Sequence, residues 1–81
     1  MLICQVKGSV ISTRKNDGLT GCKFLVVEPL QGGSTFVAAD NIGAGVGETV
    51  LVVQGSGARA AYEMPIDAAI IGIIDEGTYQ A

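Results

Sequence analysis

The stretch that decides the fold runs from residue 37 to residue 54 and reads Val37-Ala38-Ala39-Asp40-Asn41-Ile42-Gly43-Ala44-Gly45-Val46-Gly47-Glu48-Thr49-Val50-Leu51-Val52-Val53-Gln54. Glycine recurs at every second position in its middle, which lets the backbone take positive φ and pack closely against a neighbouring segment. This spacing predicts a turn between two strands. Asp40-Asn41 opens the turn, and such side chains can hydrogen-bond the local backbone. Residues 50–53 are all apolar, too short a run for a helix and rich in β-branched side chains. A strand that is apolar on both faces needs cover on both, and in so small a chain we expect that cover to come from other copies.

Length and composition also indicate that copies of the chain assemble. The chain has 81 residues, enough for a single domain over residues 1–81. Domains of this size bury only about 60% of their unfolded surface and are usually supported by disulfides, metals or oligomerisation. Charged residues make up 16% of the chain, against about 25% in an ordinary soluble domain. Because so few charges cannot cover a free particle of this size, the composition favours an oligomer.

The two cysteines, Cys4 and Cys22, do not make a metal site. There is no histidine, so a structural zinc would lack a full ligand set. Two cysteines without a signal peptide are more often buried thiols than a disulfide, although a Cys4–Cys22 bridge is the alternative. We therefore expect no metal and buried thiols.

Catalysis and cofactor binding are not favoured either. Without histidine the commonest general base is missing, and neither cysteine has a histidine to activate it. Gly55-x-Gly57-x-x-Ala60 mimics a dinucleotide fingerprint, but Pro65 stops the following helix too early. The chain is predicted not to be an enzyme and to bind no cofactor.

Four acidic residues lie at predicted strand ends, where carboxylates are ordinarily solvated or paired: Asp40, Glu48, Asp67 and Asp75. A carboxylate pair for acid–base work is therefore not favoured.

Nucleic acid and membrane are disfavoured as partners. The formal net charge is −3, aromatic residues make up 5% of the chain, and the five basic residues are scattered. No apolar stretch approaches the roughly 18 residues of a membrane span, and Met1 to Lys7 reads as a strand rather than a signal peptide. The expected location is the cytoplasm.

The pattern along the chain predicts an all-β fold. Strands are expected at residues 2–13, 23–28, 35–39, 49–54 and 68–74. In the first, alternation predicts that Cys4, Val6, Gly8 and Val10 share the buried face. A Gly-Gly hairpin turn is expected within residues 31–34, and one short helix within residues 55–62. No connection is long enough for a parallel crossover, so we expect a small, mostly antiparallel, five-stranded OB-like barrel.

Several segments together resemble the EutN/CcmL family of bacterial microcompartment vertex proteins. Residues 37–52 look like the hallmark of that family, and Gly55-Ser56-Gly57-Ala58-Arg59 is similar to its Gly-Ser-x-Ala-Arg element. Residues 65–75 look like its closing strand, and Val6-x-Gly8-x-Val10-x-Ser12-Thr13 fits its start. Order and spacing match over nearly the whole chain.

The resemblance implies a barrel assembled into homopentamers that cap the vertices of a shell built mainly from hexameric tiles, of carboxysome or metabolosome type. It implies a structural role and partnership with hexameric shell proteins. Residues near the five-fold axis, lining a narrow pore, would be Gly55, Ser56 and Gly57. Residues at subunit contacts would be Gly43, Gly45, Gly47, Arg59, Asp67 and Asp75. The alternative reading of the sequence is a small oligomeric OB-like module that binds a metabolite or single-stranded nucleic acid.

Overall fold

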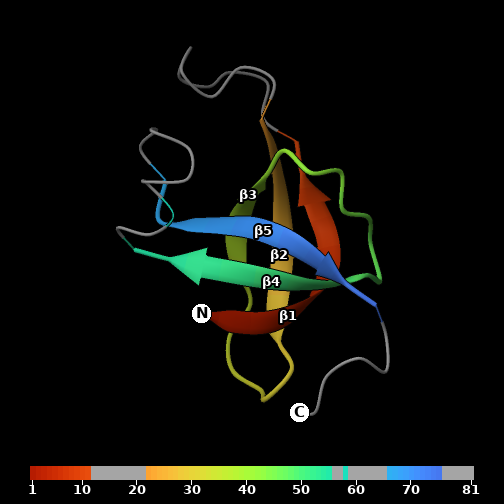
Figure 1. Cartoon of the computed structure of the whole chain (residues 1–81), viewed down its shortest axis with the longest axis vertical. Helices are drawn as coiled ribbons and strands as arrows, with labels where there is room; N and C mark the ends of the chain where they lie inside the picture. Colours follow the sequence, from red (N-terminus) through yellow and green to blue (C-terminus); the bar gives the residue numbers. More distant parts are fainter. Residues whose placement is uncertain (12–21, 56–57, 59–65, 76–81) are drawn as a thin grey trace.

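The chain folds into a closed barrel of five strands (Figure 1). The computed structural model describes residues 1–11, 22–55, 58 and 66–75. The strands are β1 (Leu2–Val10), β2 (Lys23–Pro29), β3 (Phe36–Asp40), β4 (Thr49–Gln54) and β5 (Ala68–Ile74). This confirms the predicted all-β, five-stranded barrel. The predicted short helix over residues 55–62 lies, apart from Gly55 and Ala58, outside the described residues.

The strands follow each other round the barrel in the order β1-β2-β3-β5-β4. All neighbouring pairs are antiparallel except β3 and β5, which run parallel and meet at Ala39 and Ala69. The mostly antiparallel prediction is therefore confirmed. No crossover helix is needed for the parallel pair. In the sequence, β4 comes between β3 and β5 and runs in the opposite direction, so it returns the chain to the end of the barrel where β5 begins.

The interior of the barrel is filled by alternate side chains of all five strands and by one residue of the β3–β4 loop. Its buried members are Cys4, Val6, Leu25, Val27, Ala38, Ala44, Val50, Val52, Ala68 and Ile70. Most are valine or alanine, and such small side chains suit the narrow interior of a five-stranded barrel. This interior supplies the hydrophobic stabilisation of the fold.

A second apolar cluster covers part of the outside of the barrel. Its buried members are Cys22, Ala39, Ala58, Ile66 and Ala69, with Phe24 and Val53 packed against them. Adjacent residues such as Ala38 and Ala39 therefore serve different clusters, because successive side chains of a strand point to opposite faces. The chain thus covers part of the second apolar face itself, where the sequence led us to expect other copies.

A β-bulge in β1 overturns part of the predicted alternation. The register with β2 shifts between Val6 and Gly8, so that Gly8 pairs with Val26. Beyond the shift, Gly8 and Val10 leave the buried face, and Val10 is 39% exposed. An extra residue in one strand reverses the inward and outward positions that follow it. The prediction that Gly8 and Val10 share the face of Cys4 and Val6 was therefore wrong.

Candidate functional site

The β3–β4 loop, residues 41–48, is fixed at its start by the buried carboxylate of Asp40. Asp40 is 0% exposed. Its Oδ1 accepts hydrogen bonds from the backbone N–H of Ile42 at 2.9 Å and Gly43 at 3.3 Å, and its Oδ2 accepts from Gly43 at 3.3 Å and Ala44 at 2.9 Å. A carboxylate that accepts several amide hydrogen bonds is strongly held. We expected Asp40 to be solvated or paired at a strand end. It is instead buried as the organiser of the loop, a role indicated by the Asp-Asn pair before the glycines.

The end of the same loop is held by Glu48 and by β1. The Glu48 Oε1 accepts a hydrogen bond from the Gly45 N–H at 2.6 Å. Backbone hydrogen bonds of 2.9 Å join Gly47 N–H to the Val6 carbonyl and Val6 N–H to the Glu48 carbonyl. Gly43 and Gly47 have φ of 103° and 91°, which favours glycine at both positions. The predicted glycine turn is confirmed, and the loop is a fixed part of the surface.

Gly55 and Asp67 lie together where β4 ends and β5 begins. The Gly55 N–H donates to the Asp67 carbonyl at 2.7 Å, and the Gly55 carbonyl accepts from the Ala58 N–H at 3.1 Å. Gly55 has a φ of 67°. Of the other residues predicted here, Ser56, Gly57 and Arg59 lie outside the described residues.

Gly47 and Asp75 lie together at the opposite end of β5 from Asp67. Asp75 follows the last residue of that strand, whereas Asp67 precedes its first. A hollow of about 350 Å³ lies there, lined by Gln5, Gly47, Glu48, Thr49, Ile73, Ile74 and Asp75. The structure thus brings Gly47 and Asp75 together at one end of β5, and Gly55, predicted at the pore, together with Asp67 at the other end.

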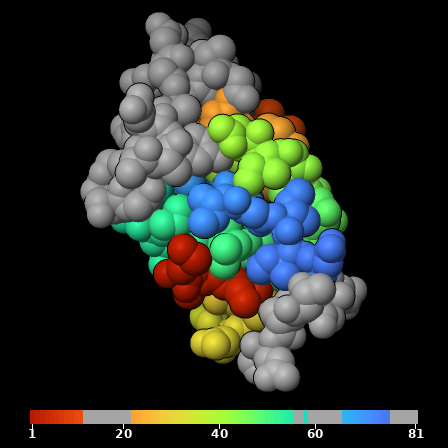
Figure 2. All heavy atoms as spheres, viewed as in Figure 1, coloured from red at the N-terminus to blue at the C-terminus, as the bar shows by residue number. Residues whose placement is uncertain are grey.

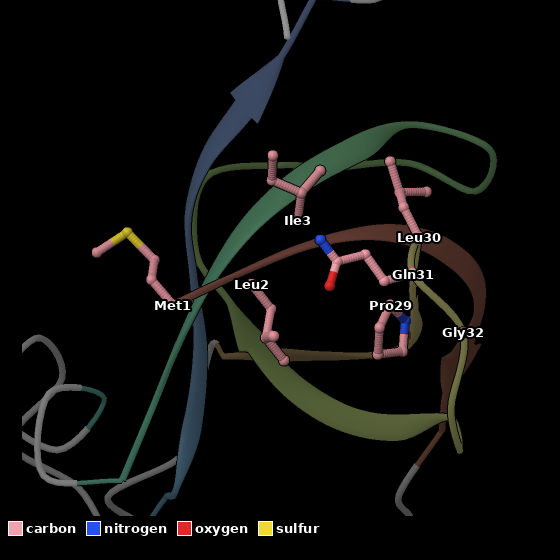
Figure 3. Close-up of a pocket in the computed structure, with 7 residues that line it drawn as sticks. All are labelled: Met1, Leu2, Ile3, Pro29, Leu30, Gln31 and Gly32. Carbon is pink, nitrogen blue, oxygen red and sulfur yellow. The ribbon is translucent and has the colours of Figure 1, made fainter. Parts of the chain in front are cut away.

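A second hollow, of about 310 Å³, opens at the mouth of the barrel (Figure 3). Its lining comes from the start of β1 and the β2–β3 turn: Met1, Leu2, Ile3, Pro29, Leu30, Gln31 and Gly32. The Leu30 N–H donates to the Ile3 carbonyl at 3.0 Å, which joins the two segments. Sequence reasoning missed this hollow because its two sides are far apart in the chain.

The cysteines form no disulfide with each other. Cys4 lies in the barrel interior and Cys22 in the outer cluster, so the wall of the barrel separates them. Burial raises the pKa of the Cys4 thiol, which keeps it protonated and weakly nucleophilic. The prediction of buried thiols is confirmed.

Two negative findings concern the described part of the chain alone. Within residues 1–11, 22–55, 58 and 66–75, no three His, Cys, Asp or Glu side chains gather into a group that could hold a metal ion. No helix in this part is long and apolar enough to cross a membrane.

Comparison with known proteins gives consistent matches over nearly the whole chain. Residues 1–75 match the family described as "Ethanolamine utilisation protein EutN/carboxysome". The carboxysome shell vertex protein CcmL of Thermosynechococcus vestitus is 49% identical over 83 residues, covering 93% of this chain and 84% of the relative. The bacterial microcompartment shell vertex protein EutN of Escherichia coli K12 is 45% identical over 84 residues, covering 94% of this chain and 88% of the relative.

Solved structures agree with the sequence matches. The GrpN pentameric microcompartment shell protein from Rhodospirillum rubrum superposes with a TM-score of 0.85 at 48% identity, covering 93% of this chain and 94% of that chain. Sequence and barrel therefore agree with the same set of proteins, and the chain belongs to the EutN/CcmL family.

Proposed function

We propose that five copies of this chain form a closed ring that caps a vertex of a bacterial microcompartment shell. The observation that carries this proposal is the 48% identity, over 93% of the chain, to a protein described as a pentameric microcompartment shell protein. The relatives described as shell vertex proteins support the same role. The role is structural, and the absence of histidine from the sequence fits it.

Exposed apolar side chains on the described surface support assembly. They include Val37, Ile71 and Ile73, which lie on strands rather than at the tips of turns. Exposed apolar patches on a protein surface generally mark interaction sites.

Within the ring, we propose two roles for the predicted site residues, one at the pore and one at the subunit contacts. Gly55, with Ser56 and Gly57, lies toward the five-fold axis and lines a narrow pore. The glycine loop, Asp67, Asp75 and Arg59 contribute to subunit contacts. The supporting observation is that the loop is held rigid by Asp40 and Glu48, since a preorganised surface loses less entropy on binding.

The ring's partners in the shell are hexameric shell proteins, which form flat facets. A pentamer supplies the curvature that hexamers alone leave open. Co-assembly of the purified chain with such hexamers, followed by electron microscopy of closed particles, tests this partnership.

Native mass spectrometry tests the ring itself. Five times 8.3 kDa gives an expected mass of about 41.5 kDa. A species at this mass would support the proposal. A monomer or dimer at micromolar concentration would contradict it.

A further inference from the structure

The hollow at the mouth of the barrel lies between two segments that are far apart in the sequence. One wall is the start of β1, and the other is the turn between β2 and β3. In the space-filling view, the start of the chain (red) lies beside that turn (yellow) (Figure 2). We call this space of about 310 Å³ the mouth hollow, and residues 1–3 and 29–32 line it.

The walls of the mouth hollow are mostly apolar. Leu2 packs against the interior cluster, so the hollow has an apolar floor. Met1 and Leu30 lie at its rim and are 76% and 36% exposed. None of the described residues that line the hollow has an acidic or basic side chain. A ligand with an apolar body would remove this surface from water, which is favourable.

Backbone hydrogen bonds hold the two walls in place. The Leu30 N–H donates to the Ile3 carbonyl at 3.0 Å and ties the turn to β1. The Gly32 N–H donates to the Pro29 carbonyl at 3.0 Å and closes the turn itself. Gly32 has a φ of 94°, a conformation that favours glycine. The hollow is therefore formed before any ligand arrives, and a preorganised site loses less entropy on binding.

Gln31 brings a hydrogen-bonding side chain to the mouth hollow. In Figure 3 this side chain points from the turn toward β1, with its amide group at the tip. Within the described part of the chain, no group forms a hydrogen bond with this amide. A primary amide has two donor hydrogens and one acceptor oxygen. It can therefore bind a hydroxyl or carbonyl group of a ligand whose apolar part fills the hollow.

We propose that the mouth hollow binds a small neutral amphiphile, a short aliphatic chain that ends in a hydroxyl or carbonyl group. Pockets of about 300–1,000 Å³ with mostly apolar walls and a few polar groups are typical of small-molecule sites. The mouth hollow lies at the low end of that range, which limits the ligand to a short chain. An ionised ligand is disfavoured, because it would lose hydration without gaining an ion pair with a side chain of the walls. The proposal goes beyond the shell role and uses no contact between subunits.

Methyl NMR of the full chain tests the site, with 1-hexanol as the probe. In a sample labelled with ¹³C at the methyl groups, we expect saturable shifts at Leu2, Ile3 and Leu30. The dissociation constant should be in the millimolar range, because so small a ligand makes few contacts. Methyl groups of the barrel interior, such as those of Val50 and Ile70, should not shift.

Leu30→Trp places a larger side chain at the rim of the mouth hollow, and Val46→Trp is its matched control. Both positions are exposed, at 36% and 67%, so the barrel tolerates both changes, and Val46 does not line the hollow. We expect Leu30→Trp to weaken probe binding at least tenfold and Val46→Trp to leave it unchanged. Gln31→Leu keeps the size of the side chain but removes the amide. It should raise the dissociation constant about threefold or more, because one hydrogen bond is lost.

Saturable shifts at the mouth hollow that weaken in Leu30→Trp and Gln31→Leu, but not in Val46→Trp, would support the proposal. Shifts that do not saturate, that spread to the interior methyl groups or that persist unchanged in Leu30→Trp would overturn the site. Unchanged affinity in Gln31→Leu would overturn the role of the amide and, with it, the proposed class of ligand. The mass of the assembly tests the proposed function separately, so the two failures are distinguishable.

Discussion

Removing the charge of Asp40 tests whether the glycine loop depends on that buried carboxylate. The variant Asp40→Asn keeps the size of the side chain and one acceptor oxygen, but it replaces the other oxygen with an NH₂ group. Two of the bonds to the carboxylate are short, at 2.9 Å from Ile42 and from Ala44, and they use different oxygens. The amide can therefore preserve only one of the two.

The expected cost follows from these contacts. A hydrogen bond to a charged group contributes about 1.5–3 kcal/mol, and an unsatisfied buried donor costs about 1–3 kcal/mol. We therefore expect Asp40→Asn to lower the free energy of unfolding by about 2–3 kcal/mol, since it loses one such bond and weakens the other. Asp40→Ala loses both short bonds and should cost about 3–6 kcal/mol. A chain of this length is stable by only about 4–12 kcal/mol, so the alanine variant should be close to unfolding.

Urea unfolding followed by circular dichroism measures these differences. All variants must be compared at one protein concentration, because assembly adds to apparent stability. The control is Glu28→Gln, which neutralises a carboxylate whose side chain is 44% exposed and lies 3.8 Å from the Lys7 ammonium. This control should change stability by no more than about 1 kcal/mol. An Asp40→Asn variant within about 0.5 kcal/mol of wild type, the range of neutral surface changes, would refute the reasoning.

Three further predictions follow from the interior and the loop. Ile70→Ala removes the largest fully buried side chain among the described residues and should lower the free energy of unfolding by about 2–5 kcal/mol in the same urea assay; a cost below about 1 kcal/mol would mean that the barrel collapses around the cavity. Gly43→Ala forces an L-residue into a φ of 103° and should cost about 1–2 kcal/mol, whereas Gly72→Ala should not destabilise an isolated subunit. Iodoacetamide should alkylate Cys4 much more slowly in the folded chain than in urea, because burial raises the pKa of its thiol and blocks access; equal rates, measured by mass spectrometry, would contradict that burial.

Much of the fold was predictable because its signals are local. Residues 49–54 and 68–74 were predicted as strands from their short apolar runs, and the structure has β4 and β5 with those same bounds. The glycine turn followed from glycine spacing, and the local hydrogen bonds of Asp40 from the Asp-Asn pair. These features depend on backbone preferences of a few neighbouring residues, which a sequence displays directly.

The candidate site was less predictable, because it depends on contacts between distant segments. Asp67 and Asp75 looked alike as acids at strand ends, yet β5 separates them, and they join different groups of residues. Gly8 was predicted on the buried face, and only the register with β2 places it beside the outward Val26. The mouth of the barrel combines residues 1–3 with residues 29–32, a proximity that no local pattern indicates.

The sequence by itself determined the class of fold, the strand positions and the family, since each rests on spacing along the chain. Only the tertiary structure decided the strand order, the parallel β3–β5 closure and the split of the apolar residues into an interior and an outer cluster. It also decided the bulge at residues 6–8, which turns Gly8 and Val10 outward. The physical reason is that side chains alternate between the two faces of a strand with a period of two. One inserted residue therefore moves every later side chain of the strand to the opposite face. The position of the insertion is set by pairing with strands that are distant in the sequence.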